Sequence, residues 1–176
     1  MTWNNIEIMK LNETLEGAFS EQITLELASS IVYLQLAIAL DEADLPGMAS
    51  WMRIQADEER THAAKFITHA ADRGNSPQIG LIEAPVLKEN SVRAVFEASL
   101  DNEQRVSNSI RALYRLAQAE GDIDSMPLLY WFIQEQIEEE ATVSGILGRL
   151  HMIGDDGAGL LRLDAELGAR AATPAQ

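Results

Sequence analysis

Hydrophobic residues recur along this chain at intervals of three or four positions, the spacing that gathers them on one face of an α-helix. No stretch of the sequence alternates apolar and polar residues in the manner of a β-strand. Glycine, proline and capping residues divide the pattern into predicted helices at about 12–42, 46–73, 91–120, 124–153 and 159–170, followed by a flexible tail at 171–176. The pattern predicts one all-α domain that occupies residues 1–176.

The link between the second and third predicted helices, NSPQIGLIEAPVLKEN, has no clear periodicity and contains two prolines. Extended at ~3.3 Å per residue, it reaches ~50 Å. A helix of about 30 residues is ~45 Å long, so the link can run from one end of a bundle to the other. The helices that it joins can then lie parallel. This predicts a four-helix bundle with one long crossover connection and a short fifth C-terminal helix.

Each long helix carries a glutamate within its predicted inward-facing stripe. The other residues of these stripes, mostly apolar, are, from the first helix to the fourth, Ile23, Leu27, Ser30, Tyr33, Leu34 and Ala37; Met48, Trp51, Met52, Ala56, Ala63 and Phe66; Phe96, Leu100, Val106, Ile110 and Leu113; and Leu128, Phe132, Ile146 and Leu150. Their acids are Glu26, Glu59, Glu103 and Glu139, each near the middle of its helix. Middle positions share one level in a bundle of similar helices, so the four carboxylates are expected to meet.

Buried carboxylates without a counter-charge are costly, and no Lys or Arg occurs near these acids in the stripes. Divalent cations are the remaining compensation. His62 lies one turn after Glu59, and Gln136 lies one turn before Glu139 on the same side. One histidine with several carboxylates suits iron or manganese, with zinc as a competitor.

Two further histidines, His69 and His151, are expected at the surface or at helix boundaries. Taken singly, the acidic motifs also have explanations that involve no metal. Glutamates in QEQIEEEA, residues 134–141, are usual on a solvated helix face, and a lone Glu-x-x-His is a weak metal signal. A metal-free structural bundle is the least favoured reading, because it would leave the four acids uncompensated.

The formal net charge of −15 argues against binding to nucleic acids or to anionic membrane surfaces. The chain has no cysteine, which excludes disulfides and thiolate metal sites and fits the cytoplasm, with an oxidising compartment as the alternative. The N-terminal residues show no secretory signal, and the apolar run from Leu27 to Leu40 is too short to cross a bilayer. We expect a protein that does not associate with membranes.

Four segments together resemble the non-haem bacterial ferritins in order and spacing. They are TLELASSIVY (24–33), DEERTH (57–62), LDNEQ (100–104) and YWFIQEQIEEE (130–140). The segment QEQIEEE (134–140) is most similar to the ferritins of the actinobacterial branch. The resemblance covers nearly the whole chain, and the four motifs are highly specific as a set.

The resemblance implies a ferroxidase centre. Glu26, Glu59 and His62 would hold a first iron, and Glu59 would bridge to a second iron held by Glu103 and Glu139, with Gln136 close by. A third-iron site of several bacterial ferritins corresponds to Glu58, Glu135 and Glu138. Tyr33 corresponds to a tyrosine beside the centre with a redox or hydrogen-bonding role, and Trp131 to a nearby tryptophan. Glu140 would face solvent or a subunit contact.

Two departures from related families shape the cofactor prediction. Bacterioferritins have a second Glu-x-x-His on the fourth helix, where this chain has Gln136 to Glu139. Their haem-ligating methionine falls between the Glu and His of the second helix, where Arg60 and Thr61 stand, so no haem is expected. Thr61 and Ala64 also stand where animal heavy-chain ferritins carry acids for mineral nucleation.

The function that the resemblance implies is oxidation of Fe(II) by O2 and storage of ferric mineral within a cage of 24 identical subunits. Helix five would line a symmetry axis of the cage, with Leu160, Leu161, Leu163 and Leu167 packed against symmetry mates. A storage subunit without rapid oxidation and a small di-iron oxidase that never mineralises iron are the rival functions. The second usually carries two Glu-x-x-His pairs, and this chain has one.

Overall fold

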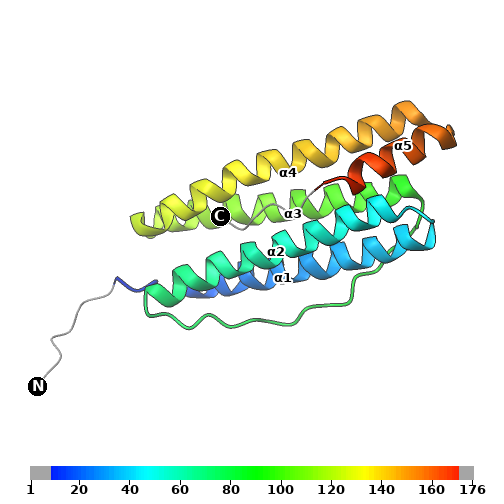
Figure 1. The fold of residues 1–176 in the computed structure, drawn as a ribbon. Helices are drawn as coiled ribbons and strands as arrows, with labels where there is room; N and C mark the ends of the chain where they lie inside the picture. The colour runs from blue at the N-terminus through cyan, green and yellow to red at the C-terminus, as the bar shows by residue number, and fades with distance from the viewer. Residues whose placement is uncertain (1–8, 171–176) are drawn as a thin grey trace, which may run out of the picture.

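The computed structural model describes residues 9–170, and these contain five α-helices and no strand. α1 (Glu13–Glu42), α2 (Pro46–Asp72), α3 (Val92–Ala119) and α4 (Met126–Ile153) form the bundle, and α5 (Gly157–Gly168) packs at one end of it (Figure 1). A single 3-10 turn, Ile123–Ser125, precedes α4. The predicted ferritin-like four-helix bundle with a short fifth helix is confirmed. The predicted tail at 171–176 lies outside the described residues.

Local sequence chemistry explains where the long helices begin and end. The side chains of Asn12 and Ser91 accept hydrogen bonds from the amides of Leu15 (2.9 Å) and Ala94 (3.2 Å), and so cap α1 and α3. Proline stands in the first turn of both α2 and α4, where its missing N–H is not needed. Gly121 follows α3 with φ +70°, a conformation that glycine adopts without strain.

The fifth helix starts earlier than predicted. The predicted start at 159 leaves the segment 154–158 between two helices, yet α5 begins at Gly157. The reason is Asp156, whose side chain accepts a hydrogen bond from the amide of Ala158 at 3.1 Å and caps the helix.

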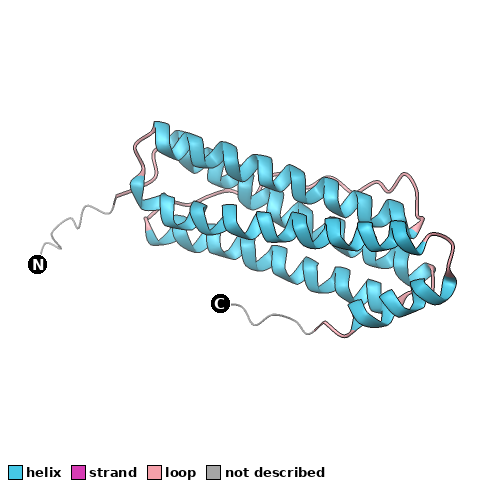
Figure 2. Cartoon of the chain, turned by 90° about the horizontal axis from the view of Figure 1, so that it is seen from above, coloured by secondary structure: helices cyan, strands magenta, loops and turns pink. Residues whose placement is uncertain are grey.

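The long link follows α1 along the whole bundle, and α2 and α3 run in the same direction (Figures 1 and 2). Three alternate link amides are hydrogen-bonded to α1 side chains four residues apart: Ser76 to Glu16 (2.8 Å), Gln78 to Ser20 (3.0 Å) and Gly80 to Thr24 (2.8 Å). Two extended residues advance ~6.6 Å and four helical residues ~6.0 Å. The two repeats therefore stay in register over this stretch.

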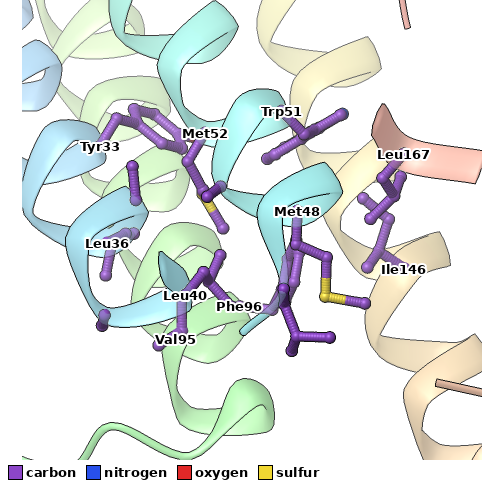
Figure 3. Close-up of a cluster of buried hydrophobic side chains, with 14 of the residues drawn as sticks. Tyr33, Leu36, Leu40, Met48, Trp51, Met52, Val95, Phe96, Ile146 and Leu167 are labelled. Atoms are coloured by element: carbon purple, nitrogen blue, oxygen red, sulfur yellow. The ribbon is translucent and has the colours of Figure 1, made fainter. Parts of the chain in front are cut away.

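The hydrophobic core consists of two clusters. One, shown in part in Figure 3, surrounds Trp51 and includes Tyr33, Met48, Phe96 and Leu167. The other lies towards the opposite end and includes Phe19, Phe66, Ile110 and Phe132. Between them, each long helix contributes polar residues, so the core is interrupted at mid-length.

Leu34 and Leu128, which the pattern places in the inward-facing stripes, lie off the buried face. Leu34 is 40% exposed, and Leu36 fills the core in its place. Leu128 is half-buried beside the fully buried Leu129. An error of one residue turns a helical side chain by about 100°, so periodicity alone leaves such positions ambiguous.

By length and composition alone, α1 could cross a membrane, with a mean hydropathy of 1.8 over its most apolar stretch. The apolar run at 27–40 alone is too short, so the sequence predicts no membrane-spanning helix here. Half of that stretch is buried inside the bundle, and α1 also buries Gln22, Glu26, Ser29 and Ser30 among its partners. These features are typical of a core helix.

α5 packs on the beginning of α2 within its own chain. The side chain of Asp164 accepts a hydrogen bond from the amide of Met48 at 2.8 Å, which caps α2 where Leu45 offers no side-chain cap. Gly47 and Gly168 touch, and a Cβ on Gly47 would lie 2.0 Å from the carbonyl oxygen of Asp164. Only glycine permits so close an approach.

This packing corrects the prediction that the four leucines of α5 face symmetry mates. Leu163 and Leu167 are buried in the core of their own chain, and Leu160 packs partly against it. Leu161 alone of the four is exposed, at 62%. Sequence could show that α5 is amphipathic but not which surface covers its apolar side.

Candidate metal centre

The six predicted ligands lie at one level, in the polar layer that separates the two core clusters. They come from all four long helices: Glu26 from α1, Glu59 and His62 from α2, Glu103 from α3, and Gln136 and Glu139 from α4. Each is at most 8% exposed. The expectation that the four acids point inwards holds in the structure.

Glu26, Glu59 and His62 form a compact triad. Each offers one ligand atom, and these atoms all lie within 4.8 Å of one another. Glu59 Oε2 is 3.7 Å from His62 Nδ1, one turn apart on α2. Gln22 donates to Glu26 Oε1 at 2.7 Å, and the other Glu26 oxygen, Oε2, is buried without a donor. This donor set of two carboxylates and one imidazole fits a divalent first-row metal ion.

Glu103 and Glu139 occupy the other half of the centre and are held by neutral donors. Tyr33 donates a short hydrogen bond to Glu103 Oε1 from α1. Gln136 donates to Glu103 Oε2 at 3.1 Å. Gln55 donates to Glu139 Oε2 at 2.8 Å. Amides and a phenol orient these carboxylates without neutralising their charge, so the charge stays available to a cation.

Unsatisfied polar atoms are concentrated at this centre. Within residues 9–170, five buried side-chain atoms have no hydrogen-bond partner: Glu26 Oε2, Glu59 Oε2, His62 Nδ1, Asn102 Nδ2 and Gln136 Oε1. Four of the five belong to predicted ligands. Buried polar groups are nearly always satisfied in proteins, so a cluster of free lone pairs indicates the place of a ligand that accepts them.

Burial raises the pKa of every carboxyl group at the centre. Desolvation is the main cause for Glu26 and Glu59, with the neighbouring carboxylates Glu59 and Glu103, respectively, as the next cause. It also raises the pKa of Glu103, against the hydrogen bond from Tyr33. The pKa of Glu139 rises to about 7, through desolvation and then the charges of Glu103 and Glu58. Without a cation, the centre therefore favours protonated acids.

Tyr33 is fully buried beside Glu103. Ser99 donates to its hydroxyl oxygen at 3.1 Å, while the hydroxyl itself donates to Glu103. Desolvation, and then the charge of Glu103, raise the pKa of Tyr33 well above its usual value, so the side chain is a neutral phenol. The predicted hydrogen-bonding position next to the centre is present.

The residues predicted for a third site lie outside this layer. Glu58 is half-buried and forms an ion pair with Arg170, whose Nη2 lies 2.9 Å and 3.0 Å from its two oxygens. Glu135 is half-buried and Glu138 exposed on α4. Sequence reasoning had found no cation near the acids, because Arg170 is 112 residues away from Glu58 along the chain.

Glu140, Trp131 and His69 lie near the ends of the site or beside it. Glu140 is half-buried and contacts α3 of its own chain. It accepts a hydrogen bond from Ser107 and forms an ion pair with Arg111 at 3.4 Å. Trp131 contacts the ring of His62, with centroids 5.8 Å apart. His69 is half-buried and stacks on Phe19 near the end of α2, as its boundary assignment predicted.

Sequence reasoning also missed the polar residues that support the ligands. Gln22, Gln55 and Ser99 are buried and bond to ligands or to Tyr33. The available signal was their helical phase, because each falls on the inward side one turn from a ligand.

A model of the ferritin-like domain matches residues 16–153. The chain belongs to the ferritin family. It is 34% identical over 160 residues to a bacterial non-heme ferritin of Bacteroides fragilis, covering 91% of this chain and 99% of that protein. It is 33% identical over 158 residues to a probable bacterial non-heme ferritin-like protein of Haemophilus influenzae, covering 90% and 96% of the two chains.

Solved structures agree with this ferritin assignment. An open-pore ferritin from the archaeon Archaeoglobus fulgidus is 34% identical, with a TM-score of 0.89 and coverage of 92% of this chain and 100% of that one. An engineered closed form of the same ferritin gives 35% identity, a TM-score of 0.90 and coverage of 93% and 100%. The likeness to non-haem ferritins is confirmed, and the narrower placement in the actinobacterial branch stays a prediction.

Proposed function

We propose that this ferritin oxidises Fe(II) with O2 at a two-iron centre in each subunit and stores the ferric product in a cage of 24 subunits. Iron storage is the function of the family to which the chain belongs. Oxidation at this centre, the number of subunits and the identity of the oxidant are our proposals.

The observation that carries the proposal is the convergence of free ligand atoms from four helices. Glu26 Oε2, Glu59 Oε2 and His62 Nδ1 receive no hydrogen bond from a neutral donor among the described residues, and one ligand atom of each of the three residues lies within 4.8 Å of the others. The Glu26 and Glu59 carboxyl groups are close enough to share a proton when no cation is bound. A passive structural bundle would have no reason to keep such atoms in its driest layer, because each costs ~1–3 kcal/mol when left unsatisfied.

The two halves of the centre suggest two iron positions. Glu26, Glu59 and His62 would bind the first Fe(II). Glu59 would also contact the second, which Glu103 and Glu139 would hold. Gln136 is bonded to Glu103 through its amide nitrogen, so its orphaned carbonyl oxygen is free to face the second ion or its water.

Oxidation of an iron pair at this centre transfers two electrons to O2. Each of two Fe(II) ions loses one electron, and O2 gains both and two protons to reach the level of hydrogen peroxide. Carboxylates favour this step because their negative charge stabilises Fe(III) more than Fe(II). Tyr33, a buried neutral phenol bonded to Glu103, is proposed to hold that ligand in position through this hydrogen bond.

The remaining site proposals follow from the resemblance. Glu58, Glu135 and Glu138 are proposed as an outer, third iron position, where iron would have to displace Arg170 from the Glu58 carboxylate. No haem is proposed, because Arg60 and Thr61 stand where bacterioferritins place their haem-ligating methionine. The protein is proposed to work in the cytoplasm, where reduced iron is available and where a chain without cysteine loses nothing to the reducing conditions.

Assembly into a cage is proposed from the family and from the surface. The net charge of −15 per chain would give a cage a strong negative potential, which draws Fe(II) towards it. Size-exclusion chromatography with light scattering tests the subunit number directly. A monomer or dimer would instead support the rival small di-iron oxidase.

The oxidation proposal is tested by adding Fe(II) in air and following ferric absorbance. We expect the double variant Glu59→Ala, His62→Ala to lose at least ten-fold in initial rate. Glu59→Gln, which keeps the shape of the side chain, guards against a loss of folding. Glu97→Gln, an exposed change on α3, is the matched control. A double variant as fast as the parent would support the passive storage subunit and refute the proposal.

A further inference from the structure

We propose that Arg170, two residues beyond the end of α5, is a positioning residue for the metal ligand Glu139 and acts through Gln55. The inference rests on the proposed function, since it assumes that Glu139 binds a metal ion. It adds a cationic residue from outside the four-helix bundle to a centre otherwise built within it.

The connection consists of two consecutive hydrogen bonds. Arg170 Nη1 donates to Gln55 Oε1, and Gln55 Nε2 donates to Glu139 Oε2 at 2.8 Å. Gln55 is 1% exposed, so solvent does not compete for either end of its amide. The two bonds connect Arg170 and Gln55, which are 115 positions apart in the sequence, to Glu139 on α4.

The chemistry of the end groups determines the orientation of the amide. A guanidinium can only donate hydrogen bonds, and an ionised carboxylate can only accept them. Between these two groups, the glutamine must turn its oxygen towards Arg170 and its nitrogen towards Glu139. The opposite orientation would place oxygen against oxygen and N–H against N–H. Arg170 thereby selects the orientation in which Gln55 supports the ligand.

Arg170 is itself held by several partners. Its Nη2 lies 3.0 Å and 2.9 Å from the two oxygens of Glu58. Its guanidinium carbon lies 5.5 Å from the centre of a Trp51 ring. A planar fork that pairs with a carboxylate on one arm leaves the other arm with a defined direction, which a lysine could not provide.

The backbone that carries Arg170 is anchored independently of its side chain. Asp164 caps α2 at Met48, Leu163 and Leu167 are buried, and Gly168 touches Gly47. Replacing the arginine side chain should therefore leave α5 in place. A change in metal binding on its loss can then be ascribed to the hydrogen-bond chain.

The experiment is calorimetric titration with Zn(II), which follows binding to the two central positions, and to any outer position, without any redox reaction. We expect Arg170→Gln to weaken binding of the second ion by about three- to ten-fold, the effect of one lost hydrogen bond, and to leave the first ion unchanged. Gln55→Leu should produce a similar loss. The double variant should lose no more than Gln55→Leu alone, because both changes interrupt one chain.

Controls separate this role from general effects on α5. Arg149→Gln removes the same charge and breaks a two-pronged ion pair between α4 and Glu166 of α5, so it should bind both ions like the parent. Glu58→Gln frees one arm of Arg170 and reports the contribution of that ion pair. Thermal unfolding of each metal-free variant shows that it is folded.

Three outcomes overturn the inference. Arg170→Gln could bind the second ion as tightly as the parent, it could weaken both ions equally, or its effect could add in full to that of Gln55→Leu. Any of these, with normal binding by the parent, leaves the proposed function intact. A parent that binds no pair of Zn(II) ions would overturn both proposals together.

Discussion

Glu59 Oε2 and His62 Nδ1 lie 3.7 Å apart on one turn of α2, and neither atom has a hydrogen-bond partner within residues 9–170. Both are also buried, at 1% and 4% exposure. A carboxylate oxygen and an imidazole nitrogen at this distance could share a cation between them. Without a cation, the two unsatisfied atoms destabilise the folded protein, and this destabilisation can be measured.

Zn(II) should stabilise the protein, and should do so more at pH 8 than at pH 5.5. The ligands must lose protons to bind metal, and burial raises the pKa of Glu26, Glu59 and Glu103. At a free concentration of 100 times the dissociation constant, one site adds about 2.7 kcal/mol. Differential scanning calorimetry with and without a chelator measures the effect. Stabilisation that survives Glu59→Ala with His62→Ala would place the metal elsewhere.

Glu139→Gln should stabilise the metal-free protein at pH 8 and change it little near pH 4.5. The pKa of Glu139 is raised from 4.5 to about 7 in the folded chain, so its favourable contribution is present below 4.5 and lost as the pH rises through 7. The shift corresponds to about 3 kcal/mol at most. Urea unfolding across this pH range tests it, with the exposed Glu138→Gln as control. A gain of the same size at both pH values would contradict the assigned cause.

Tyr33→Phe should destabilise the metal-free protein by about 1–3 kcal/mol, although it removes only one oxygen atom. The change leaves the oxygen of Glu103 and the hydroxyl of Ser99 without their buried partner. Tyr130→Phe is the matched control, because that side chain is 60% exposed and should change stability by less than about 0.5 kcal/mol. Chemical denaturation compares the two variants. Equal losses of unfolding free energy in the two variants would mean that the buried hydrogen bonds of Tyr33 do not stabilise the fold.

Gly47→Ala should disrupt the packing of α5 on α2. The new Cβ would lie 2.0 Å from the carbonyl oxygen of Asp164, so backbone must move, at a cost of about 1–3 kcal/mol or more. Gly145→Ala is the opposite case, since nothing in the described chain lies within 4 Å of its Cβ, and helix propensity should add up to about 1 kcal/mol. Thermal unfolding measures both. Hydrogen exchange of α5 amides should rise in Gly47→Ala only; protection like the parent's would show that α5 is held in some other way.

Much of the site could be predicted because its ligands follow local rules. Glu26, Glu59, Glu103 and Glu139 repeat the phase of the apolar residues around them, and their positions near mid-helix place them at one level. Leu34 and Leu128 show the limit of the same rule, since a shift of one residue decides between core and surface. The supporting amides, such as Gln55, were in phase too but carried no distinctive motif.

The sequence by itself determined the helices, the parallel course of α2 and α3, and the inward acids, because periodicity, capping and link length act over short stretches of chain. Only the tertiary structure decided that α5 packs on its own subunit and that Arg170 reaches Gln55 and Glu58. These contacts join residues more than 100 positions apart and depend on the close approach of Gly47 and Gly168. No local pattern encodes that approach, since it exists only when both helices are folded against each other.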